Sequence, residues 1–362
     1  MGTVGGHEPY TIEQSVSLPA DWDDLVLADP AAEYTHCAHW LESVRRCYDG
    51  AKLLVLTVRQ EGELIGGLAA VDRRVGRLRR LDSSLDGTTG GPLLHRQLDQ
   101  MSRRRLFLEL VRRFRALRRG PLTALGMALN ASGEEAYGPL LAGEGDWLRH
   151  DAPTAVVSLS GGIEDVEKNK LVMNKRNERN RGLRRGAEVF ATKDPAWLER
   201  YYRLYLQAAR HWKVEPVPES FLHSLLDGPG DRDGAGDVFF TCVKIGDRVI
   251  GGHLNLHLGD RVFAWNGVTD PAYARSHFPA TLCFWGDMVE ACRRGALWLD
   301  FGASGVAASL STFKKYFGAQ MEQRGYYTSE SAALKLARKL RRGPAGSGRH
   351  RVRWHDTLRR RS

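Results

Sequence analysis

Three polar side chains, those of His253, Asn255 and His257, alternate along a segment that is expected to be a strand. Alternate residues of a strand point to the same face, so these three side chains would share one face. A histidine has an ordinary pKa near neutrality, so it can accept or pass a proton at physiological pH. The row therefore either lines a cleft, with His253 as base or proton relay, or forms the solvent face of an antiparallel sheet.

A second candidate group lies in LDFGASGVAASLSTFKKYFG, residues 299–318. The segment is rich in small residues, but it lacks the Gly-Lys-Ser/Thr ending of a Walker phosphate loop. The pattern predicts a core strand that ends at Asp300-Phe301-Gly302, then a pliable loop, and then a short helix that presents Lys314 to a cleft. An ammonium group in that place can stabilise a phosphate or a developing oxyanion.

A third candidate is the start of a helix in ARSHFPATLCFW, residues 274–285. Arg275 and the free backbone amides near Ala280 and Thr281 can bind the phosphates of a donor substrate. Pro279 removes one of those amides, and the glycines of a phosphate loop are absent. An ordinary loop with a helix cap is the alternative interpretation.

Other residues are less specific. Trp265 and Asn266 lie on the strand after the polar row, where they can line the same cleft. Trp212, near the end of a helix, can stack on a base or an acceptor, although a buried anchor is the more common role of tryptophan. The segment HCAHW at 36–40 has no metal-site spacing and is interpreted as packing and capping, so no metal is expected. Neither a Gly-x-Ser-x-Gly motif nor an activated cysteine is present, so no nucleophile is expected.

The composition indicates a globular protein of two domains, because 362 residues exceed one ordinary core. No apolar run reaches the length of a membrane span, and no secretory signal is visible, so the expected location is the cytoplasm. The net charge of +10 arises at one end: residues 335–362 hold eleven of the 53 basic residues and one of the 43 acidic residues. The remaining residues hold 42 of each.

The elements that must position these residues are repeated along the chain. LLVLTVRQEGELIGGLAAV (53–71) and VFFTCVKIGDRVIGGHLNL (238–256) each predict a hairpin whose second strand begins with Ile-Gly-Gly. A glycine pair inside a strand indicates a bulge or the close approach of another group. Helices are expected at 99–120, 164–186 and 279–295. The ranges 10–150 and 151–330 are therefore expected to be two α/β units of similar design, followed by a basic tail, 331–362, that is expected to be partly disordered.

At this point the sequence resembles the Fem-type branch of the GNAT acyltransferase superfamily, which has two GNAT-like domains in tandem. The resemblance covers about 10–330 and rests on the order of four loose motifs. They are GTTGGPLL (87–94), NKRNERNRGLRRGAEV (174–189), VTDPAYARSHFPATLCFW (268–285) and the Asp-Phe-Gly, Phe-Lys and aromatic-Gly series of 299–318. Relatives often have Arg after Asp-Phe-Gly, where this chain has Ala303. The implied fold class is α/β (α+β), with each domain a mixed, mostly antiparallel sheet flanked by helices.

The resemblance implies transfer of an acyl group to an amine, with aminoacyl-tRNA as the favoured donor, acyl-CoA as the alternative, and no tightly bound cofactor. A GNAT fold without catalytic activity that binds RNA or a membrane is a further alternative. Under the favoured hypothesis Lys314 and His253 are catalytic and Arg275, Ala280 and Thr281 contact the donor. Four residues are assigned to contact the substrate. Asp300 lies at the end of the predicted core strand, and Asn266, Trp265 and Trp212 lie around the cleft.

The expected partners are tRNA and a small-molecule amine. Two helices, 103–119 and 168–185, each carry eight basic residues and one acid, and they are interpreted either as solvated faces or as tracks for RNA phosphates. The basic tail is expected to add affinity for RNA or weak contact with an anionic membrane surface, or only solubility.

Overall fold

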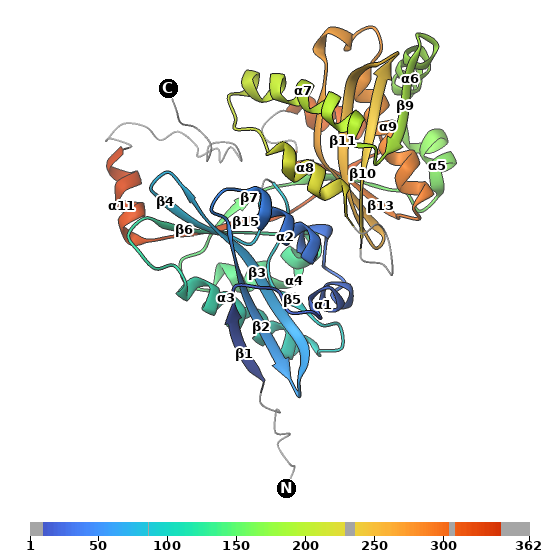
Figure 1. Cartoon of the computed structure of the whole chain (residues 1–362). Coiled ribbons are helices and arrows are strands. Elements are labelled where there is room, and N and C mark those ends of the chain that lie inside the picture. The colour runs from blue at the N-terminus through green and yellow to red at the C-terminus, as the bar shows by residue number, and fades with distance from the viewer. Residues whose placement is uncertain (1–9, 86, 229–235, 304–307, 342–362) are drawn as a thin grey trace.

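The computed structural model describes residues 10–85, 87–228, 236–303 and 308–341. The chain forms two β-sheets, each with helices packed on it, that lie one above the other in Figure 1. The N-terminal unit is below and the C-terminal unit above. The expected fold class, two tandem α/β units, is confirmed.

The N-terminal unit begins with a strand, three short helical segments and a hairpin. Its elements in chain order are β1 (Thr11–Ser15), α1 (Trp22–Ala28), η1 (Tyr34–His36), α2 (Ala38–Cys47), β2 (Lys52–Gln60), β3 (Glu63–Val75), β4 (Leu78–Asp82), β5 (Leu93–Leu94), α3 (Gln100–Ala116), β6 (Thr123–Leu129), α4 (Ala131–Ala142) and β7 (Leu148–Asp151).

The C-terminal unit repeats the pattern of hairpin, helix and strand. Its elements are β8 (Thr154–Ser158), α5 (Gly162–Asp165), η2 (Val166–Lys170), α6 (Met173–Arg184), β9 (Ala187–Thr192), α7 (Pro195–Trp212), α8 (Glu219–Leu226), β10 (Asp237–Ile245), β11 (Arg248–Leu258), β12 (Arg261–Thr269), η3 (Pro271–Tyr273), α9 (Pro279–Arg293), β13 (Trp298–Ala303), α10 (Ala308–Lys315) and β14 (Gln320–Glu322). The chain then returns to the first unit as β15 (Gly325–Glu330) and α11 (Ala332–Arg341).

The two sheets share a design. The first has the order β1-β2-β3-β4-β6-β15-β7, with β5 paired to β3, and the second has the order β14-β8-β13-β12-β11-β10-β9. In each sheet one pair of strands is parallel, β4 with β6 and β12 with β13, and the other pairs are antiparallel. The predicted mostly antiparallel sheets are confirmed.

The two Ile-Gly-Gly segments have the same local structure. Each isoleucine is the extra residue of a β-bulge, since the register shifts at Ile65 in β2–β3 and at Ile250 in β10–β11. Each bulged carbonyl accepts a backbone hydrogen bond from outside its hairpin, from His95 and from Asp270 respectively. The bulge predicted from the glycine pairs is therefore present twice.

The glycines after each bulge allow an aromatic ring to lie against the strand. A Cβ atom at Gly67 would be 2.7 Å from the ring of Trp22, and one at Gly252 would be 2.4 Å from the ring of Phe240. Real Cβ atoms do not approach other atoms this closely, so any larger residue would displace a buried ring.

The C-terminal part of the chain is divided differently from the ranges expected from the sequence. β15 lies within the range 151–330 but pairs with β6 and β7 of the first sheet. α11 lies within the expected tail, and its Leu334 is buried against the protein. The expected disorder of the tail concerns residues 342–362, which lie outside the described residues.

The interior of the protein continues from one unit into the other. The ring of Trp40 in α2 packs edge to face on Phe221 of α8 and on Trp265 of β12, with centroids 5.1 Å apart in both pairs. One hydrophobic cluster contains residues of both units, including Trp22 and Val55 of the first and Tyr201 and Phe240 of the second. This shared core fixes the units against each other.

One predicted helix is interrupted. Instead of one helix over 164–186, the chain forms α5, a single π-type turn η2, and then α6 after an extended residue at Leu171. No described helix is long and apolar enough to cross a membrane.

Candidate functional site

The parallel strands β12 and β13 separate within the second sheet. Their pairing stops at Phe263 and Asp300, although β12 continues to Thr269 and β13 to Ala303. A register shift in the β11–β12 pairing leaves Trp265 as an extra, bulged residue at the same level. Beyond Phe263 and Asp300 the two strands are not paired with each other, so the facing edge of β12 can accept an extended ligand by backbone hydrogen bonds, whereas the backbone of β13 is held by Lys314 and Asp300.

Lys314 of α10 lies at this separation. Its side chain is almost fully buried, and Nζ donates hydrogen bonds to the carbonyl oxygens of Gly302 at 2.7 Å and Ala303 at 3.1 Å. Gly302 has φ +76°, so a side chain there would be strained and the carbonyls would turn elsewhere. The predicted short helix and its lysine are thus placed at the end of β13. Residues 304–307 of the predicted loop lie outside the described residues.

Burial lowers the pKa of Lys314 to about 8, although the nearby carboxylate of Asp300 acts to raise it. A lysine with this pKa is mostly cationic at neutral pH, and it loses its charge over the mildly alkaline range. It can therefore donate to a developing oxyanion at neutral pH.

Asp300 belongs to a buried ion network between the units. Its carboxylate accepts hydrogen bonds from Thr154 Oγ1, from Arg324 Nη2 and, at 2.7 Å, from the backbone of Gly302. Arg324 Nη2 also lies 3.5 Å from Oε1 of Glu33 in the N-terminal unit. The predicted substrate contact at Asp300 is thus occupied by the chain itself, and the carboxylate holds the end of β13 in place.

The first turn of α9 contains a carboxylate from α6. Thr281 Oγ1 donates to Glu178 Oε2 at 2.6 Å, and Lys175 Nζ donates to the same oxygen at 2.7 Å. A Cβ atom at Gly182 would lie 2.5 Å from the carbonyl oxygen of His277, so α6 lies directly against the loop before α9. A helix start favours a negative charge, and here the chain supplies one itself.

The other predicted donor contacts surround this helix start. Ala280 is half-buried in the first turn, and Arg275 is exposed in the loop. Phe278, immediately before α9, has φ +53°, a conformation that bulky residues rarely adopt, and its ring contacts the guanidinium of Arg181 at 5.3 Å. Strained backbone of this kind often lies at ligand sites.

Lys175 connects the start of α9 with α10. Its ammonium lies 4.5 Å from the ring centroid of Phe313, the residue before Lys314, and 5.8 Å from that of Tyr316. Its side chain is mostly buried. The contacts run from Thr281 through Glu178 and Lys175 to Phe313, and thus join the two ends of the candidate site.

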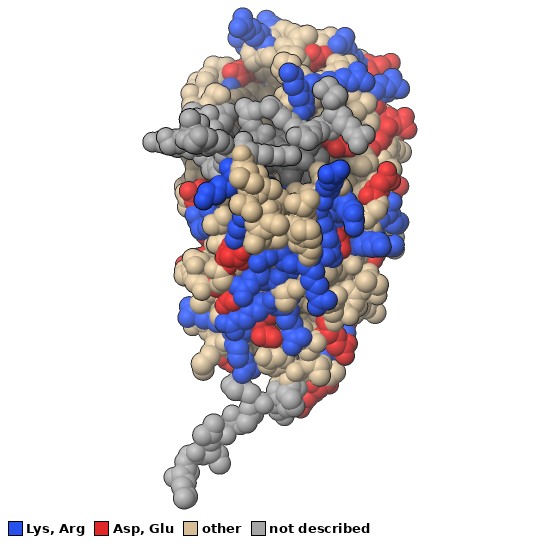
Figure 2. Space-filling model, turned by 90° about the vertical axis from the view of Figure 1, so that its left-hand side faces the viewer, with Lys and Arg blue, Asp and Glu red and all other residues tan. Residues whose placement is uncertain are grey.

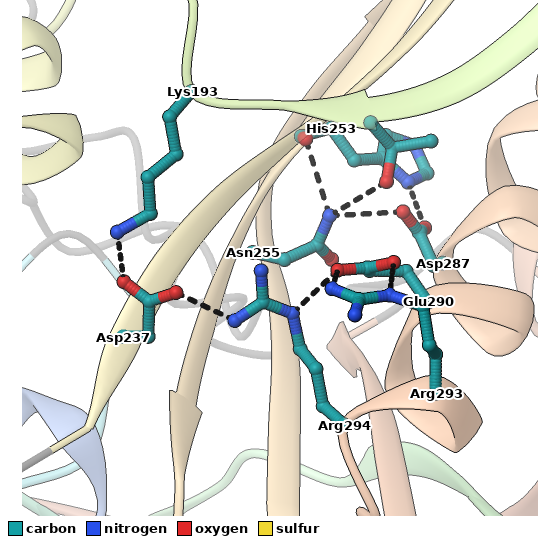
Figure 3. Close-up of polar contacts among 9 residues, drawn as sticks. Lys193, Asp237, His253, Asn255, Asp287, Glu290, Arg293 and Arg294 are labelled. Atoms are coloured by element: carbon teal, nitrogen blue, oxygen red, sulfur yellow. Dashed lines mark hydrogen bonds and ion pairs between the residues drawn. The ribbon is translucent and has the colours of Figure 1, made fainter. Parts of the chain in front are cut away.

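The polar row on β11 faces α9. His253 Nδ1 lies 2.5 Å from Asp287 Oδ2, and Asn255 Nδ2 donates to Asp287 Oδ1 at 2.9 Å (Figure 3). Asp287 is fully buried, and His257 contacts the carbonyl oxygen of Gly259 at 2.9 Å. The row therefore forms neither an open cleft nor a solvent face, because α9 covers it.

A second network in Figure 3 fixes the other end of α9. Asp237 of β10 is paired with Lys193 and with Arg294, whose Nη1 lies 2.5 Å from Asp237 Oδ2. Arg294 Nε also donates to Glu290 at 2.7 Å, and Arg293 Nη2 donates to it at 2.6 Å. All these charges are paired within the chain, so we interpret this network as structural.

His253 contacts the Lys314 region only through aromatic rings. Its ring lies edge to face with Phe284, at 5.0 Å, and Phe284 contacts Phe301 and Phe313. A Cβ atom at Gly267 would be 2.6 Å from His253 Nε2, so the second ring nitrogen lies over the backbone of β12. This geometry is that of a side chain that anchors α9 to the sheet.

We expect His253→Ala to lower the free energy of unfolding by about 1–3 kcal/mol, because Asp287 would lose a buried partner. Turnover should fall less than about tenfold, because this geometry gives His253 no role in catalysis. Loss of a general acid–base catalyst would instead lower turnover by about 10²–10⁴-fold. Urea denaturation together with kinetics tests this expectation. A loss of turnover above a hundredfold in a folded His253→Asn protein, which keeps a polar group, would instead make His253 a catalytic residue.

The remaining predicted residues have partners other than Lys314 or are exposed. Asn266 Oδ1 accepts a hydrogen bond from Tyr201 of α7 at 2.7 Å, and Trp265 packs between the units as described above. Trp212 is 50% exposed at the end of α7. We find the side chains of Asn266 and Trp265 engaged in packing and hydrogen bonding within the chain, because the bulge turns both toward α7 and α2.

The structure therefore brings together Lys314, Asp300 and the start of α9 at Ala280 and Thr281. Lys175, Glu178 and Arg324 complete the cluster, and they were missed in the sequence. One signal was available: Glu178 is the single acid in a helix with eight basic residues. Such an isolated charge of opposite sign indicates a specific partner.

A wide groove in the described part of the chain lies elsewhere. It has a volume of about 620 Å³ between α7 and the β10–β11 hairpin and is lined by residues such as Arg200, Arg203 and Asp247. A narrower crevice between the units, lined by Glu33, Arg261 and Phe263, lies beside the β12–β13 pair. We consider the second crevice more relevant, because Phe263 is the register partner of Asp300.

Comparison with known proteins concerns the fold. A family described as an acetyltransferase (GNAT) domain matches residues 170–315, which contain the strand separation, the start of α9 and Lys314. The crystal structure of FemX superposes with a TM-score of 0.66 over 91% of this chain and 99% of FemX, at 13% identity. The chain has a Fem-type tandem GNAT fold.

Two further structures share this tandem GNAT fold. A tandem GNAT protein from the clavulanic acid biosynthesis pathway superposes with a TM-score of 0.54, at 14% identity, over 88% of this chain and 98% of that protein. A conserved protein of unknown function from Bacteroides thetaiotaomicron VPI-5482 gives 0.51, at 12% identity, over 88% and 99%. No curated protein sequence matches the chain. At these identities the likeness shows the fold, and the activity must be argued from the site.

Proposed function

We infer that the protein is an amide-forming acyltransferase that moves an aminoacyl group from aminoacyl-tRNA to an amine of a small molecule. The observation that carries this proposal is the position of Lys314, a buried ammonium held by two backbone carbonyls where β12 and β13 separate. The tandem GNAT fold supports acyl transfer as the reaction class.

The chemistry needs little covalent help from the protein. The neutral amine attacks the carbonyl carbon of the activated ester, a C–N bond forms, and the C–O bond to the ribose breaks. The proton of the amine ends on the released ribose oxygen. Because the ester is already activated, orientation of the reactants and stabilisation of the developing oxyanion can supply most of the acceleration.

In this proposal the edge of β12 beyond Phe263 holds the aminoacyl group, and Lys314 faces the carbonyl that becomes the oxyanion. Asp300 keeps the ammonium charged by its own negative charge and fixes the Gly302 backbone that positions it. Arg324 holds Asp300 in turn. The last two are positioning residues.

The crevice between the units has a volume of only about 10 Å³, so in this proposal it meets no more than the reacting ammonium group of the acceptor. Oε1 of Glu33 lines this crevice and has no hydrogen-bond partner in the described part of the chain, apart from the ion pair at 3.5 Å with Arg324. A carboxylate in this position attracts an ammonium group and can orient a polar acceptor. The acceptor class that fits is therefore a small molecule with a primary amine.

The start of α9 favours tRNA over CoA as the donor. A CoA pyrophosphate would place its negative charges at this helix start, where the Glu178 carboxylate already lies. The first helical position is Pro279, which lacks an N–H group. Both features weaken a pyrophosphate site, whereas the aminoacyl end of a tRNA need not bind there.

A reconstituted reaction tests the proposal. Purified tRNA, an aminoacyl-tRNA synthetase, amino acids and a panel of primary amines are incubated with the protein, and amide products are measured by mass spectrometry. Products that disappear after RNase treatment support the proposal. Products formed from acyl-CoA without tRNA would show that acyl-CoA, and not aminoacyl-tRNA, is the donor. RNA binding without product from either donor would overturn the enzymatic assignment.

We expect Glu178→Gln to increase the affinity for CoA by about tenfold, since a charge near a partly buried helix end changes binding by about 1–2 kcal/mol. The amide oxygen can still accept from Thr281 and Lys175, so the fold should be kept. Glu167→Gln is the matched control, because Glu167 pairs with Arg179 outside the first turn of α9. Isothermal titration with CoA measures the difference in affinity. The expectation would be contradicted if the wild type bound CoA tightly and both variants bound it with the same affinity.

A further inference from the structure

One end of the N-terminal sheet brings together three segments that are far apart in the sequence. β4 and β6 begin there, since Arg79 is the register partner of Thr123, and β15 ends there, since Glu330 is the partner of Ala124. The β3–β4 turn, the loop before β6 and α11 therefore lie at the same end, and Figure 1 shows α11 beside the β3–β4 hairpin.

α11 exposes leucines on its outer face. Leu334 is buried against the protein, but Leu336 is 57% exposed and Leu340 is 75% exposed. The two exposed leucines are four residues apart, so they lie on the same side of the helix one turn from each other. An amphipathic helix normally packs its leucines against the protein. In α11 the side with Leu334 is packed, and the side with Leu336 and Leu340 is left in water.

Basic side chains lie on α11 and on the other segments at this end of the sheet. Some are paired within the protein, such as Arg338 with Glu330 at 2.6 Å and Lys335 with Asp146 at 2.7 Å. Others at this end are exposed and have no acidic partner among the described residues, namely Arg74, Arg77, Arg119 and Lys339. Figure 2 shows Lys and Arg side chains gathered on this face of the N-terminal unit.

We propose that this end of the N-terminal unit binds the surface of an anionic lipid bilayer, with Leu336 and Leu340 inserted at the headgroup level and the unpaired basic residues on lipid phosphates. A helix with leucines on one side and Lys or Arg beside them lies in the plane of a membrane interface. Basic residues near an anionic leaflet add to the attraction.

RNA is the competing partner for a basic surface. Phosphate contacts alone would explain the arginines, but they give no role to two exposed leucines, and single-stranded RNA is bound by stacking on aromatic side chains. The large apolar residues that α11 exposes are leucines, not the aromatic residues on which RNA bases stack. The lipid surface is therefore the partner that uses both features.

The test measures co-sedimentation of the full-length protein with vesicles of phosphatidylcholine alone and of phosphatidylcholine with 30% phosphatidylglycerol. We expect binding to the anionic vesicles that weakens with added salt, and a loss of about tenfold or more in Leu336→Ser/Leu340→Ser, because each leucine loses its apolar contact with the bilayer. Arg74→Ser/Arg77→Ser should also lose about tenfold, from two basic contacts.

The matched control is Met101→Ser/Met173→Ser, which removes two side chains that are 75% and 63% exposed on other elements. It should bind vesicles like the wild type, and melting temperatures of all variants show that they fold. The proposal is overturned if vesicle binding does not depend on lipid charge, or if the leucine variant binds vesicles as well as the wild type does. It is also overturned if the wild type does not bind vesicles and the leucine and arginine variants lose affinity for tRNA.

Discussion

Lys314→Met should reduce the rate of acyl transfer by about 10²–10³-fold, the usual cost of removing one donor to an oxyanion. Methionine has a volume similar to that of lysine. The substitution also removes a buried charge, which costs free energy in the folded protein, so the fold should survive. Circular dichroism and a melting curve confirm folding, and initial rates at saturating donor measure the effect. Lys315→Met is the matched control, because Lys315 is exposed one position further along the same helix. Equal rates for Lys314→Met and wild type would remove Lys314 from the site.

The same residue should determine the alkaline side of the pH profile. Because burial lowers the pKa of Lys314 to about 8, the rate contributed by its charged form is lost as the pH rises through about 8. The neutral fraction of the acceptor amine rises over the same range, so the wild-type profile should be bell-shaped. Arginine stays charged, and Lys314→Arg should therefore lose the alkaline decline even if its rate is lower.

Arg324→Met should destabilise the protein by about 3–5 kcal/mol, because it leaves the buried carboxylates of Asp300 and Glu33 without their shared cation. The loss is expected in the free energy of unfolding measured with urea. The exposed pair of Lys168 and Glu164 is the control, and Lys168→Met should cost less than about 1 kcal/mol. Similar costs for both variants would contradict a buried network that holds the two units.

The pH dependence of this loss has a defined sign. Burial acts to raise the pKa of Glu33, but Arg324 and the hydrogen bond from Thr89 lower it below its ordinary value of 4.5. The wild type therefore gains stability from Glu33 above about pH 4.5, and the gain is lost as the pH falls through the lowered value. In Arg324→Met the lowering is removed, so the difference between the two proteins should shrink on acidification.

The local features of this fold could be predicted from the sequence. The Ile-Gly-Gly bulges, the hairpins, the strand that ends near Gly302 and the helix that carries Lys314 depend on turn chemistry and on short-range patterns. The return of β15 to the first sheet could not be predicted, because strand pairing across some 200 residues leaves no trace in a local pattern. The end of the second unit was therefore placed at residue 330, although the chain returns to the first sheet from Gly325.

The site residues show the same limit. Lys314 was proposed from the sequence because a helix predicted after a run of small residues is a local signal. The polar row of His253 suggested a cleft because its covering helix, and Asp287 on it, are distant in the sequence. Trp265 looked like a substrate contact, but a bulge and the opposing Trp40 place it in the core between the units. Partners of this kind are set by tertiary contacts, which residue types alone do not reveal.

The central claim is that the aminoacyl group moves directly from tRNA to an amine. The most direct measurement uses purified tRNA charged with an isotopically labelled amino acid, free of synthetase, ATP and CoA, together with the small-molecule fraction of cells that express the gene. We predict that the label moves into an alkali-stable amide with wild-type protein and not with Lys314→Met. Release of the label only as free amino acid, with incorporation of acyl groups from acyl-CoA under the same conditions, would contradict the account.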